Sequence, residues 1–143
     1  MQLQNDPYSE QKCHATFVPL NAHLILIADI HEAVGPYSQA IKTPHAIYCS
    51  GQLPADAQGN LVDGTMDEKT KACLDALSAV LTEAGSSLDK IVKVQIFITD
   101  MKDFAEMNTQ YSLQIKHKPA RSCVAVKQLP KGADIEIECI ALP

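Results

Sequence analysis

The sequence predicts an α+β fold in which helices cover one face of a sheet. Two stretches have the apolar spacing of amphipathic helices, and short apolar runs bounded by turn residues lie before, between and after them. Their order is β-β-β-α-β-α-β-β, which is typical of a sheet with its helices on one side. The 143 residues fit one domain. We expect that domain at residues 23–143, after a weakly structured N-terminal extension at residues 1–22.

Three short strands are expected before the first helix. Residues 23–28 form a brief apolar run, which Gly35-Pro36 ends as a turn. Residues 46–50 read as a second strand. A polar loop that contains glycine then leads to a brief third strand at residues 61–62.

The first helix is predicted from its ends as well as its period. Thr65 and Glu68 have the spacing of a capping box, in which each side chain accepts from a free backbone N–H of the other. Gly85 stands where a left-handed C-terminal cap belongs. Between them, apolar residues recur at helical spacing at Cys73, Leu77, Val80, Leu81 and Ala84.

The second half of the chain alternates strands with one more helix. Residues 91–99 form a strand, and Asp100 is expected to cap the helix that follows. Residues 121–127 and 134–142 form the last two strands. The apolar stripe of the helix consists of Phe104, Met107, Tyr111 and Ile115.

Alternation along the strands predicts which side chains face the helices. The helix side is expected to hold Val92, Val94, Ile96, Ile98, Val124, Val126, Ile135, Ile137 and Cys139. The opposite side is mixed and holds Ser50, Gln52, Lys93, Gln95, Phe97, Arg121, Cys123, Glu136, Glu138 and Ile140. It is either a half-wet antiparallel surface or a face covered by another copy of the chain. Apolar residues among its charges favour the second explanation.

Composition excludes several function classes. A net charge of −5 argues against a broad surface for polyanions such as nucleic acid. The five cysteines lack a C-x-x-C pair and the five histidines are scattered, so we expect no metal site. No apolar segment approaches the ~20 residues of a membrane span. The free cysteines indicate a reducing compartment, and we expect a cytoplasmic protein, with a mitochondrial location as the alternative.

Arg121 is the only arginine of the chain. Its guanidinium is a planar fork of donors that can grip a carboxylate or phosphate through two parallel hydrogen bonds. Pro119 biases Lys118 toward an extended conformation, so Arg121 follows a stiff segment. The alternative is a surface arginine or a structural ion pair.

Six motifs in order resemble the RidA enzymes, also called the YjgF family of reactive-intermediate deaminases. They are Gly35-Pro36-Tyr37-Ser38-Gln39-Ala40, Ser50-Gly51-Gln52-Leu53-Pro54, Asn108, Pro119-Ala120-Arg121-Ser122-Cys123-Val124, Leu129-Pro130-Lys131-Gly132 and Ile135-Glu136-Ile137-Glu138. The resemblance implies a chorismate-mutase-like fold, with two helices on one face of a mixed sheet, in a homotrimer with inter-subunit clefts. It also implies hydrolysis of the 2-enamino and 2-imino acids that pyridoxal-phosphate enzymes release, without a metal or organic cofactor.

The resemblance assigns roles to single residues. Arg121 is expected to hold the substrate carboxylate, and Glu136 to orient or deprotonate the attacking water. The other substrate-binding positions are Tyr37, Ser50, Gly51, Asn108 and Cys123. Each has a plainer alternative. Cys123 could be a small core residue, and Tyr37, Ser50 and Asn108 could make turn or capping hydrogen bonds. Glu136 could form an interface ion pair with a lysine such as Lys93.

Two other function classes stay open. Some relatives resemble ribonucleases or translation inhibitors, so an RNA-directed role is one alternative, which the acidic charge disfavours. A non-catalytic binder of small carboxylates is the other.

Overall fold

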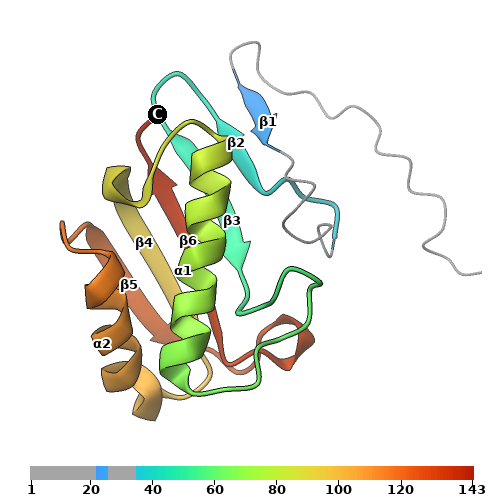
Figure 1. Cartoon of the computed structure of the whole chain (residues 1–143), viewed down its shortest axis with the longest axis vertical. Helices are drawn as coiled ribbons and strands as arrows, with labels where there is room; N and C mark the ends of the chain where they lie inside the picture. The colour runs from blue at the N-terminus through green and yellow to red at the C-terminus, as the bar shows by residue number, and fades with distance from the viewer. Residues whose placement is uncertain (1–21, 26–34) are drawn as a thin grey trace, which may run out of the picture.

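The computed structural model of the chain describes residues 22–25 and 35–143. In this part the strands form one mixed sheet in the order β1-β2-β3-β6-β4-β5, with α1 (Met66–Glu83) and α2 (Phe104–Gln114) on the same face (Figure 1). The predicted α+β sheet with two helices on one face is confirmed. The strands are β1 His23–Ile25, β2 Ala40–Lys42, β3 Ile47–Gln52, β4 Ile91–Ile98, β5 Ala120–Ala125 and β6 Ile135–Ala141.

The order β-β-β-α-β-α-β-β holds, but one of its strands was misplaced. Strand β2, at Ala40–Lys42, pairs antiparallel with both β1 and β3 and is not among the predicted strands. Residues 61–62 form no strand, because Leu61 makes only an isolated bridge to Ala55. The predicted extension at residues 1–22, apart from Ala22, and the end of the predicted first strand at residues 26–28 lie outside the described residues.

Helix α1 begins and ends where its caps predicted. The Thr65 side chain accepts from the Glu68 N–H, and the Glu68 carboxylate accepts from the Thr65 N–H at 2.8 Å. At the other end Gly85 has φ +78°, and the Ser86 N–H donates to the Leu81 carbonyl at 2.7 Å. This is a Schellman cap, which a glycine at that position permits. The predicted apolar positions of α1 are all buried in the core against the sheet.

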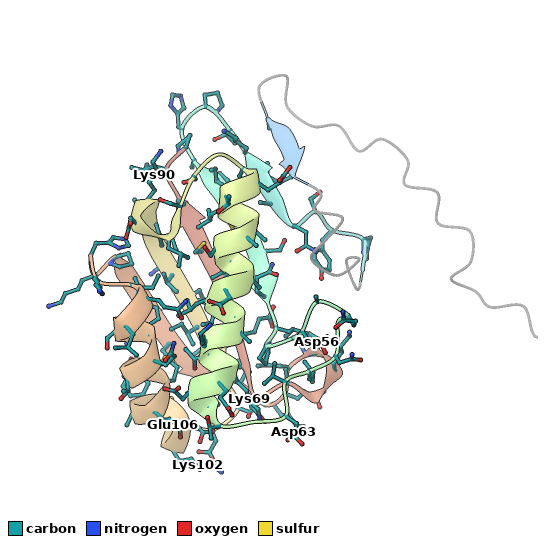
Figure 2. All side chains as sticks on the ribbon, viewed as in Figure 1. Asp56, Asp63, Lys69, Lys90, Lys102 and Glu106 are labelled. Atoms are coloured by element: carbon teal, nitrogen blue, oxygen red, sulfur yellow. The ribbon has the colours of Figure 1, made fainter. Side chains whose placement is uncertain are left out.

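Helix α2 packs beside α1 over β4 and β5 (Figure 1). Asp100 caps a short 3₁₀ turn, Met101–Asp103, which leads into α2, so it acts one turn earlier than predicted. The Glu106 carboxylate of α2 accepts from the Asp67 N–H of α1 at 3.0 Å. This bond lies at the N-terminal end of α1, where Lys69 and Glu106 are labelled in Figure 2. Lys69 in turn pairs with Asp134 at the start of β6.

The side chains of β5 lie on the opposite faces of the sheet from those predicted. This strand pairs parallel with β4, in a register that sets Arg121 beside Val94 and Cys123 beside Ile96. Since Val94 and Ile96 are buried beneath the helices, Arg121 and Cys123 lie on the helix side. Val124, predicted on the helix side, is 43% exposed on the open side instead.

Two irregularities shift further residues away from their predicted face. The register of β4 on β6 breaks between Ile91 and Lys93, and Val92 is exposed. A similar break between Cys49 and Gln52 on β3 turns Gln52 toward the helix side, where it is buried opposite Ile137. A β-bulge inverts the alternation of every residue beyond it.

Thr65→Ala tests the cap of α1. The substitution removes the oxygen that accepts from the Glu68 N–H, so we expect the free energy of unfolding to fall by about 1 kcal/mol in urea denaturation at fixed protein concentration. Thr65→Ser keeps the acceptor and is the matched control. An equal loss in both variants would show that the capping bond contributes nothing.

Candidate functional site

One hollow of about 460 Å³ lies where α2 ends and β5 begins. It is lined by Asn108, Tyr111, Ser112, Ile115, Lys116, Lys118, Pro119 and Arg121. Three of these side chains are cationic and none is acidic. The hollow therefore suits an anionic group, and it brings together two predicted site residues, Asn108 and Arg121.

Arg121 is partly buried in this hollow and carries its charge without a partner. Among the residues that the structure describes, it makes no ion pair and no side-chain hydrogen bond. Its guanidinium carbon instead lies 4.8 Å from the ring centroid of Tyr111 and 5.9 Å from that of Phe104. The structural ion pair that the sequence left open is absent from the described chain, so the donors of the guanidinium are available to a ligand.

The turn between α2 and β5 is held by a bond to a neighbouring strand. The His117 ring donates from Nε2 to the Ile91 carbonyl at 2.7 Å. Lys118 has φ +55°, so the extended conformation predicted from the following proline is wrong. A non-glycine residue at this φ is strained, and the anchored turn compensates that strain.

A second hollow, of about 380 Å³, lies on the open side of the sheet. It contains four predicted site residues, Tyr37, Ser50, Gly51 and Glu136, and is completed by Leu53, Pro130 and Glu138. Its charged side chains are both carboxylates. This second hollow is therefore negative where the first is positive.

The bulge at Ser50 and Gly51 shapes the second hollow. A Cβ atom at Gly51 would lie 1.9 Å from Oε1 of Glu136, so only glycine leaves room for this carboxylate. The bulged strand is anchored by the buried Gln52 amide, which donates to the Gln39 side chain at 3.2 Å and to the Ser50 carbonyl at 3.1 Å. The carboxylate of Glu136 thus lies directly over the backbone of β3.

Glu136 is partly buried, and its pKa is raised, first by burial and then by the neighbouring negative charge of Glu138. Within the described chain Glu136 makes no ion pair, and the Lys93 ammonium donates to Ser122 Oγ at 3.3 Å, so an ion pair of Glu136 with a lysine of another copy stays a prediction. A carboxyl with a raised pKa and no cation nearby is a suitable proton acceptor near neutral pH.

Ser50 meets both of its predictions, as a residue of the site and as a donor of a turn hydrogen bond. It lines the second hollow, and its hydroxyl donates to the Ser38 carbonyl at 2.6 Å, which is the turn hydrogen bond of the alternative. The oxygen can still accept a hydrogen bond from a ligand.

Cys123 does not line either hollow. It is partly buried, packs against the core beside Arg121 on β5 and has a raised pKa, because burial outweighs the lowering effect of the Arg121 charge. The thiol is protonated at neutral pH, which favours the small core residue of the alternative.

Within one chain the predicted site falls into two parts. Arg121 and Asn108 lie on the helix side at the edge strand β5, and Glu136 lies on the open side of β6, with β4 between the two strands. Sequence reasoning did not assign the ring of Tyr111 or the carboxylate of Glu138 to the site. For Glu138 the signal was present, since it alternates with Glu136 along β6. Tyr111 meets Arg121 only through packing of α2 on β5, which no local pattern reveals.

The profile of the family described as Endoribonuclease L-PSP matches residues 28–143. The chain belongs to this family. The L-PSP family is the RidA or YjgF family of the sequence analysis, so that recognition is confirmed.

Relatives of this L-PSP chain include both curated and solved proteins. "Protein mmf1, mitochondrial" of Schizosaccharomyces pombe is 57% identical over 77% of the chain and 70% of its own length. The structure of RidA from an Antarctic Psychrobacter has a TM-score of 0.81 and 35% identity, over 85% of this chain and 99% of that one. Escherichia coli TdcF with bound serine has a TM-score of 0.80 and 32% identity, over 85% and 98%. These likenesses confirm the YjgF-like fold.

In the described part of this L-PSP family member, no group of three or more histidine, cysteine, aspartate or glutamate side chains could hold a metal ion. No helix formed by the described residues is long and apolar enough to cross a membrane.

The raised pKa of Glu136 predicts a pH-dependent stability effect. A carboxyl whose pKa is higher in the folded than in the unfolded state stabilises the fold below its unfolded pKa, about 4.3, and this contribution is lost as the pH rises through the folded pKa. We therefore expect Glu136→Gln to raise the free energy of unfolding at pH 7 relative to wild type, and to change it little at pH 4. Urea denaturation at both pH values measures the difference.

The matched control is Asp63→Asn, which also converts a carboxyl to an amide but at an exposed loop position. The same pH-dependent gain in both variants would contradict the assignment of the effect to the burial of Glu136.

Proposed function

We propose that this protein hydrolyses reactive 2-enamino and 2-imino acids, such as 2-aminoacrylate and 2-iminobutanoate, to 2-oxo acids and ammonia. The observation that carries the proposal is the partly buried Arg121 guanidinium, which has no acidic partner among the described residues. An uncompensated guanidinium in a hollow is costly unless a ligand supplies the anion. A carboxylate fits its fork of donors with two parallel hydrogen bonds.

The structure of a relative supports a ligand as small as an amino acid. TdcF, which shares this fold, is described with bound serine, a small amino acid with one carboxylate. A 2-imino acid has the same carboxylate, bonded directly to the C=N carbon that reacts. Holding that carboxylate at Arg121 therefore fixes the position of the C=N carbon.

We further propose that the working site lies between copies of the chain in a homotrimer. Arg121 and Glu136 lie on opposite sides of the sheet, so the positive hollow of one copy would have to meet the negative hollow of the next. Their charges are complementary, which favours this contact. Tyr48 and Val124, 49% and 43% exposed on the open side, supply apolar surface for the assembly.

The reaction would need no metal or organic cofactor. An enamine first tautomerises to the imine, and Arg121 holds its carboxylate. Glu136 accepts a proton from a water molecule, whose oxygen bonds to the imine carbon and gives a carbinolamine. Glu136 returns this proton to the imine nitrogen, which becomes the amino group of the carbinolamine. The proton of the carbinol hydroxyl then passes to this amino group, the C–O bond becomes C=O as the C–N bond breaks, and ammonia leaves the 2-oxo acid. Orientation by Arg121 and a general base, worth about 10²- to 10⁴-fold, are sufficient for a substrate that also hydrolyses unaided.

Three further residues, from the two hollows, complete this proposed site. The Asn108 amide, beside Arg121, can hydrogen-bond the substrate or its water, and Tyr37 and Ser50 can do so from the other hollow. Cys123 has no covalent role, because its thiol is protonated.

The other function classes have less support. An RNA-directed role is suggested by the family's description as Endoribonuclease, but the chain has a net charge of −5 and a single arginine. Affinity for RNA depends on neutralising several phosphates. A non-catalytic carboxylate binder would not explain a base-like carboxylate at Glu136. The relative named as mitochondrial favours the mitochondrial alternative for the location.

Arg121→Lys tests the carboxylate clamp. Lysine keeps the charge but loses the bidentate fork, so we expect kcat/KM for 2-iminobutanoate to fall by about 10- to 100-fold, the value of a charged hydrogen bond. The imine is generated in situ and its disappearance is followed with and without protein. Lys127→Arg, at an exposed position after β5, controls for the exchange itself. Activity of Arg121→Lys within twofold of wild type would exclude the clamp.

A mixing experiment tests whether two copies form one site. Arg121→Ala and Glu136→Ala should each be inactive, and co-refolding them in equal amounts should restore about a quarter of wild-type activity, because random assortment in a cyclic oligomer reunites an intact arginine with an intact glutamate at that frequency. Mixing the same proteins without refolding is the control. No recovery in verified mixed oligomers would place both residues of each site in one copy.

A further inference from the structure

The orientation of the Arg121 guanidinium has to be fixed by a neighbouring group. A partly buried arginine is commonly held by a carboxylate, but no ion pair or side-chain hydrogen bond to Arg121 occurs among the described residues. Its side chain contacts aromatic rings of α2 instead. These rings are therefore the candidates for the group that holds the guanidinium.

Tyr111 is the nearer of these rings. The Arg121 guanidinium carbon lies over it at 4.8 Å from the centroid, compared with 5.9 Å for Phe104, and both distances are within the range of a cation–π contact. Tyr111 is also the more firmly held ring, since it is only 7% exposed, while Phe104 is partly buried at the start of α2. A guanidinium over a fixed ring face keeps its N–H donors at the edge, where a carboxylate can reach them.

The hydroxyl of Tyr111 takes no part in this contact. It is buried and has no hydrogen-bond partner in the described chain, and burial raises its pKa so that it stays neutral. A buried hydroxyl without a partner destabilises a fold, and phenylalanine would pack there without this cost. The ring of Tyr111, rather than its hydroxyl, is thus the part that can act on Arg121.

We propose that the ring of Tyr111 is the positioning residue of the anion site: it holds the Arg121 guanidinium over its face so that the fork points to the substrate carboxylate. This inference rests on the proposed function for the identity of the carboxylate. The contact itself lies within one copy of the chain and does not depend on assembly or turnover.

The single arginine makes the test direct. A ¹H–¹⁵N spectrum of this protein has only one arginine Nε–Hε signal, and an aromatic ring under that proton shifts it upfield. We expect the upfield shift in wild type and in Tyr111→Phe, and its loss in Tyr111→Leu. Should Tyr111→Leu fail to fold by circular dichroism, Tyr111→Met, whose longer and more flexible side chain adapts to an irregular space and has no π face, is read in the same way.

Binding of 2-oxobutanoate, a carboxylate that does not react, is the second readout. Its Kd should stay within about twofold in Tyr111→Phe and rise about tenfold in Tyr111→Leu, as the loss of a desolvated cation–π contact implies. Phe104→Leu removes the more distant ring of the same helix, and its effect on Kd should be smaller. In an Arg121→Lys background, Tyr111→Leu should cause no further loss of affinity.

Two results would overturn the proposal. One is an Nε–Hε signal that stays in place in Tyr111→Leu, and the other is a loss of affinity in Tyr111→Phe as large as in Tyr111→Leu, which would transfer the role to the hydroxyl. Failure of the proposed function looks different: wild type would leave the decay rate of the imine unchanged, while the arginine signal would still report the ring contact.

Discussion

The candidate site depends on one constraint, a partly buried guanidinium that has no counter-ion among the described residues. Arg121 can keep this state because it lies on an edge strand, beneath α2, where an aromatic ring contacts one of its faces and a hollow lies beside it. The parallel pairing of β5 with β4 creates the arrangement, since a parallel connection requires a crossover and α2 is that crossover. This crossover helix therefore also supplies walls of the positive hollow beside Arg121.

Much of the fold was predictable because its signals are local. The capping box and the glycine cap of α1 depend on residues within a few positions of one another, and both are formed as predicted. Strand Ala40–Lys42 was missed because a stretch of three residues has no readable period and is defined only by its two neighbours in the sheet. The motif at residues 35–40 overlaps the start of this strand, and its turn residues dominate the local sequence pattern.

The site shows where sequence reasoning ends. The residue types were predictable from motifs, and six of the seven predicted positions line one of the two hollows. The face of the sheet on which each side chain lies was not predictable. Alternation allows two arrangements for each strand, and pairing with strands distant in the sequence decides between them. Arg121 follows the phase of Val94 through the parallel register, and Gln52 changes phase at the bulge beside Gly51. The contact between Tyr111 and Arg121 is likewise a product of packing between separate elements.

The separation of Arg121 from Glu136 has a chemical reason. If both lay on one face within reach of each other, the guanidinium and the carboxylate would pair, and neither would be free for its proposed role as anion clamp or base. Because they lie on opposite sides of the sheet, with β4 between their strands, neither forms an ion pair among the described residues. In the proposed trimer the two hollows would meet only across a bound substrate and its water. The cost of two unpaired charges in the single chain is then recovered when the ligand arrives between them.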